Sequence, residues 1–523
     1  MIELSSFVTG RWVAPAADSA VICSAVTGEV VARAYSGDVA MTDVLEYARV
    51  KGGCALRKLT FRQRAELIKK LAEYLGAHKE RLFELSRHAG ATKFDAMLDV
   101  DGGIGVLFVY ASKGCRELPD AHLMLDGEIE PLVKSGGFIG RHVCSPLQGA
   151  AIHINAFNFP CWGLLEKLAP ALLAGVPVIT KPATVTSYVA EALVRLIDAS
   201  GILPPGALQM IVGSTGDLLD HLDGQDVVSF TGSANTAQLL QRHPVMAREA
   251  VRFVAERDSL NAAILCPDAA LQTPEFDLFV KEVVREMTVK AGQKCTAIRR
   301  AFVPRAVFEE AGERIAAKLA QIRVGDPACE GVRMGPVVGL LQRQSVLDLV
   351  AKLREESELV CGDTTNFEVV GASAETGAFL PPVLLACSRP GAARNVHAIE
   401  AFGPVSTLMP YDDLDEAIDL VKCGQGSLVA SAYTNDDSAA ARLVEGIGSF
   451  HGRLLFVDRD CGAEHTGHGS PMPHLVHGGP GRAGGGEELG GLRGIAHYLQ
   501  RIALQGTSAR ILGITGEQPT GTK

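Results

Sequence analysis

The chain has 523 residues, of which 47% are hydrophobic, and its 50 Lys and Arg against 60 Asp and Glu give a formal net charge of −10. This length predicts two or three packed units, and the negative charge argues against a nucleic-acid or anionic-membrane partner. No apolar run reaches the length of a membrane span. The twelve cysteines stand singly, without CxxC pairs, which is typical of a reducing cytoplasm.

The N-terminal third predicts short strands followed by a helical layer. Residues 1–36 read as strands, with a hairpin over residues 6–13 that turns at Gly10. From residue 38 to 115 apolar residues recur at helical spacing, with a break at Gly76.

A second hairpin is expected at residues 128–143, where an alternating pattern surrounds Gly136-Gly137. An extended polar hairpin of this kind can add its strands to the sheet of a partner.

From Gly149 strand and helix patterns alternate, which predicts a parallel sheet with right-handed crossovers. Strands are expected at 150–154, 176–180, 208–212 and 227–230, and helices at 164–174, 188–199, near 218 and at 234–241. Ligands bind at the carboxyl ends of strands in such sheets. The residues at those ends are Asn158, Lys181, Gly213 and Gly232-Ser233.

A second α/β unit is expected from Asp258 onward. Its strands are predicted at 262–265, 300–303, 380–385, 405–409 and 428–433, and its helices at 279–290, 305–320, 337–354, 412–422 and 436–446. Residues 461–491 form a predicted long loop rich in Gly, His and Pro, and a loop of this length is usually functional or disordered. Residues 496–503 are compatible with a strand or a helix.

Cys295 lies on the turn Ala291–Thr296, between a helical run and a strand-like run. A thiolate attacks carbonyls well, and a turn can direct a backbone N–H at the oxyanion that forms. The competing interpretation is a buried structural thiol, which is the commonest state of a cysteine.

Two further residues complete a set suited to cysteine-based oxidation of a carbonyl. Asn158 can donate its amide to the oxyanion, or it can cap its own turn. Glu256 follows an apolar run, so burial is expected to raise its pKa and make it a base that activates water. The alternative for Glu256 is an ion pair with Arg252 or Arg257.

Candidate cofactor residues follow two of the strands. The stretch Phe230-Thr231-Gly232-Ser233 ends a strand and opens a helix, whose N-terminus can receive a phosphate or can simply be capped by Ser233. Lys181 can reach a ribose hydroxyl or a phosphate, or it can be a solvated strand end.

These residues together resemble the aldehyde dehydrogenase superfamily over nearly the whole chain. The motifs that carry the resemblance, in order, are Gly10-Arg11-Trp12, Asn158-Phe159-Pro160, Lys181-Pro182, Phe230-Thr231-Gly232-Ser233, Glu256, Gly292-Gln293-Lys294-Cys295, Gly325-Asp326-Pro327, Met334-Gly335-Pro336 and Glu400-Ala401-Phe402-Gly403-Pro404-Val405. The resemblance implies Cys295 as nucleophile, Glu256 as base and Asn158 in the oxyanion hole. It also implies that Glu400 and Phe402 hold the nicotinamide ribose and ring.

The resemblance also implies an α/β fold with three domains. A Rossmann-like cofactor-binding domain would comprise residues 1–127 and 149–256, and an α/β catalytic domain residues 257–495. A small β bridging domain for oligomerisation would comprise residues 128–148 and 496–523. Pairing through the hairpin implies a homodimer, with a tetramer as the alternative.

Thr184 departs from the pattern of the family members that use NAD, which commonly carry a glutamate three residues after the lysine matched by Lys181. A missing carboxylate removes repulsion against a 2′-phosphate, and Lys181 would attract that phosphate. We therefore expect NADP as cofactor. A groove at Thr184 that accepts both NAD and NADP is the alternative.

The tail from Pro473 to Gly491 resembles a narrower group of the family, which oxidises aldehydes attached to coenzyme A in the phenylacetate and benzoyl-CoA pathways. A chain that ends near residue 523 would lack the hydratase domain that is fused to the phenylacetate enzyme. The resemblance therefore favours the benzoyl-CoA type, whose implied substrate is 3,4-dehydroadipyl-CoA semialdehyde. We expect His477 and Glu488 to line the substrate entrance.

The tail also contains two HxxH pairs, formed by His465 with His468 and by His474 with His477. They have metal-ligand spacing, but they are not on a helix, so we expect no metal there.

Two other functions remain open at this stage. A CoA-acylating aldehyde dehydrogenase would use coenzyme A instead of water to cleave the thioester, and it would not need the base Glu256. A non-catalytic relative would keep the fold without needing Cys295, Asn158 and Glu256 together.

Overall fold

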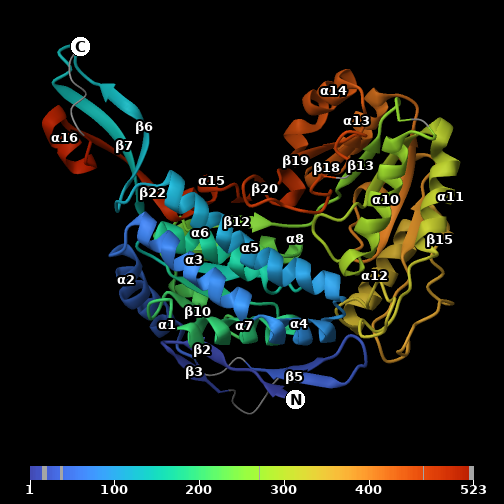
Figure 1. Ribbon diagram of the computed structural model, residues 1–523, viewed down its shortest axis with the longest axis horizontal. Coiled ribbons are helices and arrows are strands. Elements are labelled where there is room, and N and C mark those ends of the chain that lie inside the picture. The colour runs from blue at the N-terminus through green and yellow to red at the C-terminus, as the bar shows by residue number, and fades with distance from the viewer. Residues whose placement is uncertain (15–19, 36–38, 270, 463, 518–523) are drawn as a thin grey trace.

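Two seven-stranded sheets and a projecting three-stranded arm organise the molecule (Figure 1). The structure is a computed structural model that describes residues 1–14, 20–35, 39–269, 271–462 and 464–517. Among these residues, no helix combines the length and the apolar character that crossing a bilayer requires.

The first sheet has the order β12-β11-β8-β9-β10-β2-β3. Its strands are β12 (Arg252–Glu256), β11 (Val227–Thr231), β8 (Ala151–Ile154), β9 (Val178–Lys181), β10 (Leu208–Met210), β2 (Ser6–Val8) and β3 (Arg11–Val13). The strands from β12 to β10 are parallel, whereas β2 pairs antiparallel with β10 and β3. The strand–helix alternation predicted after Gly149 and the hairpin that turns at Gly10 are confirmed.

Helices cover both faces of the first sheet. One face packs against helices α3 (Phe61–Ala77), α5 (Lys93–Glu117), α6 (Trp162–Ala174) and α7 (Ser187–Ser200), and the other against α1 (Met41–Tyr47), α8 (Ala234–Gln241) and α9 (Pro244–Arg248). Alternate residues of β8 serve the two faces, because Ala151 packs with the first set of helices and Ile152 with the second. Both faces are therefore apolar, as expected for a parallel sheet covered on each side.

Short elements complete this part of the chain. They are strands β1 (Ile2–Glu3), β4 (Ala20–Cys23) and β5 (Val30–Ala34), which form a small sheet, and helices α2 (Cys54–Arg57) and α4 (Glu80–Ser86).

The second sheet has the order β15-β16-β17-β14-β13-β18-β19. Its strands are β15 (Glu358–Cys361), β16 (Val383–Ala386), β17 (Val405–Tyr411), β14 (Arg300–Pro304), β13 (Ala262–Leu265), β18 (Ser427–Tyr433) and β19 (His451–Val457). All its pairings are parallel except that of β15 with β16. The chain therefore passes from the first sheet to the second between β12 and β13, directly after Glu256.

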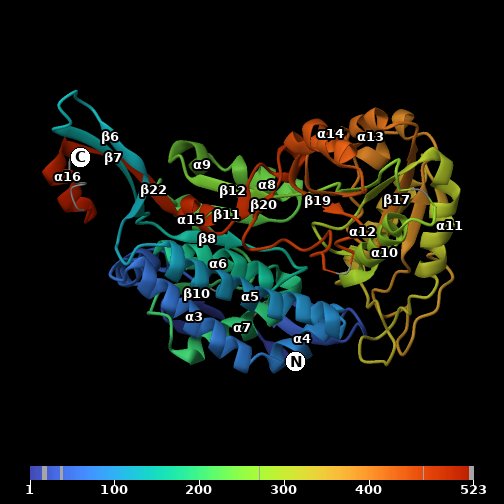
Figure 2. The ribbon, with the colours of Figure 1, turned by 45° about the horizontal axis from the view of Figure 1, so that its top comes forward.

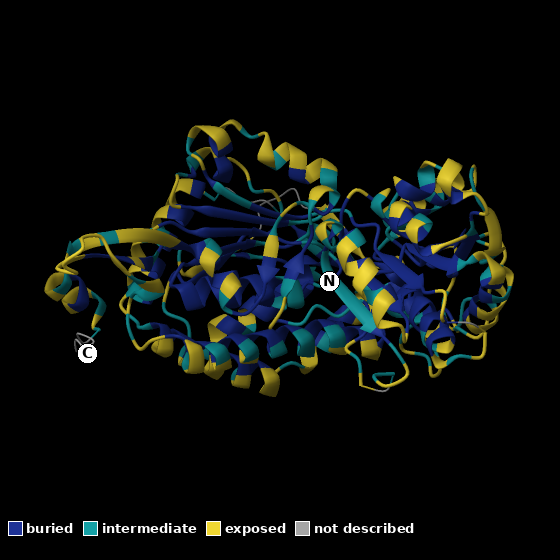
Figure 3. Cartoon of the chain, turned by 90° about the horizontal axis from the view of Figure 1, so that it is seen from above, coloured by how far each residue is buried: buried dark blue, intermediate teal, exposed yellow. Residues whose placement is uncertain are grey.

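Helices cover both faces of the second sheet (Figure 2). Helices α10 (Pro274–Thr288) and α11 (Phe308–Leu319) pack on one face, and α12 (Leu340–Leu353), α13 (Leu414–Lys422) and α14 (Asp437–Ile447) pack on the other. Figure 3 shows the central strands as buried, with exposed residues on the outer surfaces of the helices.

The arm leaves the first sheet on the side away from the second one (Figures 1 and 2). It consists of β6 (Met124–Pro131), β7 (Phe138–Pro146), β22 (Leu499–Thr507) and the helix α16 (Ser508–Thr515). The predicted hairpin at residues 128–143 is confirmed and is longer at both ends. Within the segment 496–503, for which the sequence allowed a strand or a helix, β22 begins at Leu499. This strand pairs with β7 from Leu499 opposite Pro146 to Thr507 opposite Phe138. Residues 518–523 of the predicted bridging segment lie outside the described residues.

The tail predicted as a long loop contains regular structure, which corrects the sequence interpretation. Strands β20 (Val476–Gly478) and β21 (Glu487–Leu489) form a hairpin, and α15 (Leu492–Ile495) follows it. The glycines let this tail lie against both sheets: a Cβ on Gly486 would meet the backbone of Ala255 in β12 at 2.7 Å, and a Cβ on Gly452 in β19 would lie 1.7 Å from the carbonyl oxygen of Gly478.

Candidate active site

Cys295 lies on a tightly held loop between α10 and β14. The loop starts with three residues of positive φ, Lys290, Ala291 and Gly292, and a Cβ on Gly292 would meet the carbonyl oxygen of Gly403 at 2.2 Å. Asn261 Nδ2 donates to the carbonyl oxygen of Cys295 at 2.7 Å. The side chain of Cys295 is half-buried and lines a pocket, a position from which a small molecule can be attacked.

The pocket draws its lining from both sheets and from the tail. Its polar lining residues include Asn158, Thr231, Glu256, Cys295 and His477. Asn158, Thr231 and Glu256 lie at or after the carboxyl end of a strand, where ligands of parallel sheets bind. The expected gathering of Cys295, Asn158 and Glu256 is therefore seen in the geometry.

Asn158 lies on the loop between β8 and α6, directly against the cysteine loop. Its Nδ2 donates to the carbonyl oxygen of Gln293 at 3.0 Å, and the side chain is buried. An amide nitrogen carries two hydrogens, so this bond fixes the amide and leaves a second N–H for an oxyanion.

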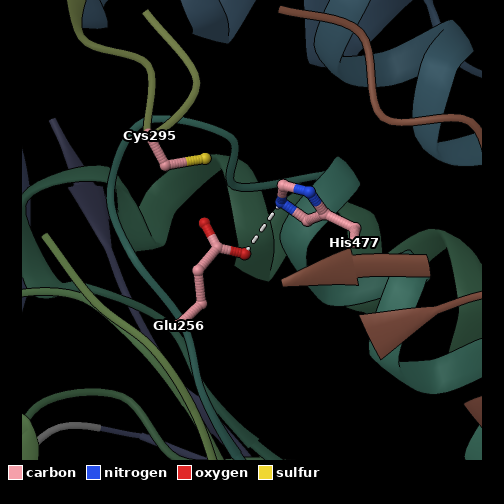
Figure 4. Close-up of side chains that lie close together, drawn as sticks. All are labelled: Glu256, Cys295 and His477. Carbon is pink, nitrogen blue, oxygen red and sulfur yellow. Dashed lines mark ion pairs between the residues drawn. The ribbon is translucent and has the colours of Figure 1, made fainter. Parts of the chain in front are cut away.

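Glu256 ends β12 and is buried beside Cys295 (Figure 4). Its Oε2 accepts a hydrogen bond from His477 Nε2 at 3.0 Å, whereas its Oε1 is buried and has no hydrogen-bond partner among the described residues. A carboxylate oxygen of Glu256, the thiol sulfur and a His477 ring nitrogen all lie within 4.8 Å of one another.

The two arginines considered as partners of Glu256 bind elsewhere. Arg252 donates to the carbonyl oxygens of His497 and Leu499, and Arg257 donates to the carbonyl oxygen of Gly481. These contacts hold the tail and the start of the arm against the first sheet.

The pKa of Glu256 differs from the sequence expectation. Burial raises the pKa, as expected, but the charge and hydrogen bond of His477 and the charge of Lys167 outweigh burial, so the pKa is lowered. The expectation of a raised pKa is wrong because the sequence did not show that the tail brings an imidazole to the carboxylate. For Cys295, burial and the negative charge of Glu256 raise the pKa, so the resting side chain is a thiol.

Glu488 lies in the interior and not at a substrate entrance. It pairs across the tail hairpin with His477, and its carboxylate accepts from Lys167 Nζ at 3.1 Å and from Ser229 Oγ at 3.0 Å. His477 does line the pocket, where its ring nitrogen Nε2 hydrogen-bonds to Glu256.

Glu166 and Lys167 are the residues of this site that sequence reasoning missed. Both are buried on α6, are linked by an ion pair at 3.2 Å and line the pocket. Burial raises the pKa of Glu166 despite its neighbour Lys167. The available signal was a charged pair inside an otherwise apolar helix, because such pairs are rarely buried without a specific role.

The predicted cofactor residues lie at the ends of β9, β10 and β11. Lys181 ends β9, Thr184 opens the turn after it, and Gly213 follows β10 with φ of 89°. Lys181 is partly buried, and burial lowers its pKa.

The start of α8, at residues 230–233, has the Ser233 cap that was one of the two interpretations of the sequence. Phe230 and Thr231 end β11, Gly232 follows, and Ser233 caps α8 by accepting from the amide of Thr236. The amide of Ala234 donates to Asp258 at 2.8 Å, so a carboxylate lies at the place where we expected a phosphate.

Glu400 and Phe402 lie on the loop before β17. Glu400 Oε2 accepts from the amide of Ser259 at 3.0 Å, and Oε1 lies 3.5 Å from Arg299 Nε and makes no hydrogen bond within the described chain. Burial raises the pKa of Glu400 to about 7 although Arg299 opposes the shift. The ring of Phe402 packs edge-on against Phe157 at 5.7 Å.

The two HxxH pairs do not converge in the described part of the chain. His468 is buried and contacts Ser431 Oγ at 2.8 Å, whereas His474 is exposed. The three groups that do converge are Glu256, Cys295 and His477.

The sequence profile described as the aldehyde dehydrogenase family matches residues 12–501. The chain is 48% identical over 480 residues to a 3,4-dehydroadipyl-CoA semialdehyde dehydrogenase of Aromatoleum evansii, and the match covers 92% of this chain and 93% of that protein.

Solved structures share the fold at low sequence identity. A 3,6-anhydro-L-galactose dehydrogenase in complex with NADP aligns with a TM-score of 0.83 at 24% identity, covering 96% of this chain and 99% of that one. Betaine aldehyde dehydrogenase from Staphylococcus aureus in complex with NAD+ aligns with a TM-score of 0.82 at 21% identity, covering 100% and 97%. The predicted fold class is therefore confirmed.

Proposed function

We propose that this chain, which belongs to the aldehyde dehydrogenase family, oxidises a CoA-linked semialdehyde to the carboxylic acid with NADP as cofactor. The observation that carries the proposal is the convergence of Cys295, Glu256 and Asn158 in one pocket. The substrate we propose is 3,4-dehydroadipyl-CoA semialdehyde, by analogy with the Aromatoleum relative.

The first half of the reaction forms a thioester on Cys295. The thiol releases its proton to solvent, and its sulfur adds to the aldehyde carbon. The remaining N–H of Asn158 and the backbone amide at Cys295 stabilise the oxyanion. A nicotinamide cofactor held by Glu400 and Phe402 would supply the acceptor for the hydride of this carbon, and the carbonyl would then re-form as a thioester.

The second half hydrolyses that thioester. Glu256 Oε1 accepts a proton from water, whose oxygen attacks the thioester carbon, and the carbon–sulfur bond breaks to give the acid. The proton held on Glu256 then balances the charge of the released Cys295 sulfur. The free Oε1 atom beside the sulfur fits this role.

The residues proposed to bind the cofactor suit its chemistry. Glu400 Oε1 is a buried acceptor with no hydrogen-bond partner in the described chain, which suits a ribose hydroxyl. The aromatic ring of Phe402 is held in place by Phe157 and suits a nicotinamide ring.

The preference for NADP rests on Lys181 and Thr184. Lys181 forms no ion pair with the described residues, so its ammonium group is available to a phosphate. Thr184 introduces no negative charge beside it. NAD would lack the attraction between Lys181 and the 2′-phosphate and should bind more weakly.

For the assembly we propose a homodimer that pairs through the arm. The arm exposes apolar side chains at Leu132 between β6 and β7, at Phe138 on β7 and at Ile502 on β22, which suits burial against a second copy. The cytoplasmic location stays a prediction from the cysteine pattern.

The proposal is tested by following formation of NADPH or NADH with free and CoA-linked aldehydes, for the wild type and for Cys295→Ala. We expect rapid NADP reduction with CoA-linked semialdehydes, slower reduction of NAD, and no activity in the variant. Equal rates with simple free aldehydes would contradict the substrate class, and an active Cys295→Ala would contradict the mechanism.

A further inference from the structure

His477 has no role in the mechanism above, yet it makes the closest contact with the base. It lies at the centre of the short strand β20, and its side chain is only 4% exposed, against 3% for Glu256. Its Nε2 lies 3.0 Å from Glu256 Oε2 (Figure 4). The contact joins the tail to the last residue of β12 and is inaccessible to solvent.

The tail backbone fixes this contact from both sides. The amide of Arg257 donates to the carbonyl oxygen of Ala483 at 2.9 Å, directly after Glu256 in the chain. His477 pairs with Glu488 across the hairpin, and Glu488 is tied to α6 through Lys167. The imidazole therefore has little freedom to leave the carboxylate.

The hydrogen bond from His477 makes the two carboxylate oxygens of Glu256 different from each other. Oε2 is occupied by His477, so the carboxylate cannot rotate without breaking that bond. Oε1 is buried, has no hydrogen-bond partner among the described residues and is the oxygen left free for a proton from water. An unheld carboxylate would distribute itself over several rotamers, and loss of orientation of a base lowers catalysis strongly.

We propose that His477 is a positioning residue for Glu256, which it orients and whose negative charge it stabilises, so that Oε1 faces Cys295 and the hydrolytic water. This inference rests on the proposed function. It assigns to His477 a specific part in the hydrolytic half-reaction, in addition to its place in the pocket lining.

Several charged groups surround the pair and bear on its protonation. They are Glu166 and Lys167 on α6 and Arg453 on β19, and the neutral thiol of Cys295 also contacts Glu256. For His477 itself, burial lowers the pKa, but Glu256 and Glu166 raise it and Arg453 opposes them weakly, so the pKa is raised overall.

His477 keeps the carboxylate of Glu256 ionised at low pH. With the imidazole present, the pKa of Glu256 is lowered, so the carboxylate is ionised and competent as a base well into the acidic range. Without it, burial raises the pKa of Glu256 with less opposition, and the base becomes protonated at a higher pH. Loss of His477 should therefore remove activity first at low pH.

The test compares wild type with His477→Leu, His477→Gln and His474→Leu in the full chain. Two quantities are measured from about pH 5.5 to 9, the range in which such a base is probed: the initial burst of reduced cofactor and the steady-state kcat. His474 is an exposed histidine on the same segment, so its variant controls for changes in the tail.

For His477→Leu we expect a retained burst and a steady-state kcat that falls about tenfold on an acidic limb within this range, whereas the wild type stays level there because the pKa of its Glu256 is about 2. His477→Gln can still donate a hydrogen bond but carries no charge. It should recover turnover at high pH while keeping the acidic limb. His474→Leu should match the wild type.

An unchanged profile in His477→Leu, or a burst that falls together with kcat, would overturn the inference. If the wild type itself reduces no cofactor, the proposed function fails instead, and alkylation of Cys295 by iodoacetamide then tests the inference alone. Removal of a positive charge near the thiol should slow alkylation at a fixed mildly alkaline pH in His477→Leu but not in His474→Leu. Equal alkylation rates in the three proteins would contradict it.

Discussion

At the scale of single residues, the site combines a protonated thiol with an ionised base. Burial and the charge of Glu256 raise the pKa of Cys295, and His477 lowers the pKa of Glu256. A resting thiol is protected from reaction in the absence of substrate, because the thiolate is the reactive form. Approach of a cation to the pocket would favour the thiolate, since an opposite charge lowers the pKa of an acid.

Glu256→Gln separates the hydrolytic mechanism from its CoA-acylating alternative. The amide keeps the shape of the side chain but cannot accept a proton from water, so kcat should fall by roughly 100-fold or more. The burst of NADPH should persist, because thioester formation precedes the lost step. Undiminished steady-state turnover, with coenzyme A as the acceptor, would instead support the acylating enzyme.

Thr184→Glu tests the cofactor preference. A carboxylate there would repel the 2′-phosphate, and we expect KM for NADP to rise about tenfold, equivalent to about 1.4 kcal/mol, with little change for NAD. Initial rates against cofactor concentration measure both constants. Thr184→Gln, of similar size and no charge, is the control. An equal rise of KM for both cofactors, or the same rise in the control, would mean that Thr184 affects only the shape of the groove.

At the scale of elements, the tail acts as a strap across the two sheets. Its hairpin delivers His477 to Glu256 and Glu488 to Lys167, and it passes within contact distance of β12 and β19. Close backbone approach explains the glycine content of the tail and its surroundings, because even a Cβ would clash at several of these positions.

Gly452→Ala should destabilise the protein at this crossing. The added methyl group would lie 1.7 Å from the carbonyl oxygen of Gly478, and forcing such a contact costs roughly 1–3 kcal/mol. Gly448→Ala is the matched control, since no atom lies within 4 Å of its Cβ position. Thermal unfolding of both variants, with kcat, measures the effect; a melting temperature of Gly452→Ala equal to that of the control would contradict the strap.

At the scale of the whole molecule, active site and arm are joined through the tail. The chain passes from the hairpin of His477 and Glu488 through α15 into β22, the arm strand that pairs with β7. Arg252, four residues before Glu256, donates to the carbonyl oxygens of His497 and Leu499 at the base of the arm. The same segment of the chain, the tail, therefore holds His477 in the active site and supplies the arm strand β22.

Ile502→Asp should weaken the proposed dimer. Its side chain is 40% exposed on β22, and burial of a carboxylate in an apolar interface is unfavourable. Sedimentation velocity at micromolar concentration should show monomer in the variant and dimer in the wild type. Leu341→Asp, at a position 91% exposed on α12, should leave the dimer intact. A wild type that sediments as a monomer, or a variant that stays dimeric, would contradict pairing through this face of the arm.

The sequence by itself determined the two α/β units and the candidates Cys295, Asn158 and Glu256, because hydrophobic periodicity and short motifs are local properties. It also placed most strands within a few residues, as with β13 at residues 262–265. It predicted a structureless tail, because the strands β20 and β21 are short and rich in Gly and their stability comes from pairing with each other and packing on β12 and β19.

Only the tertiary structure decided the electrostatics of the site. The pKa of Glu256 depends on His477, which is more than 200 residues away in the chain, and the place of Glu488 depends on Lys167 and Ser229. Coulomb interactions and burial depend on distances in space, and the fold alone sets those distances. Residue types can therefore be read from the chain as candidates, whereas their charge states follow from the neighbours that the fold provides.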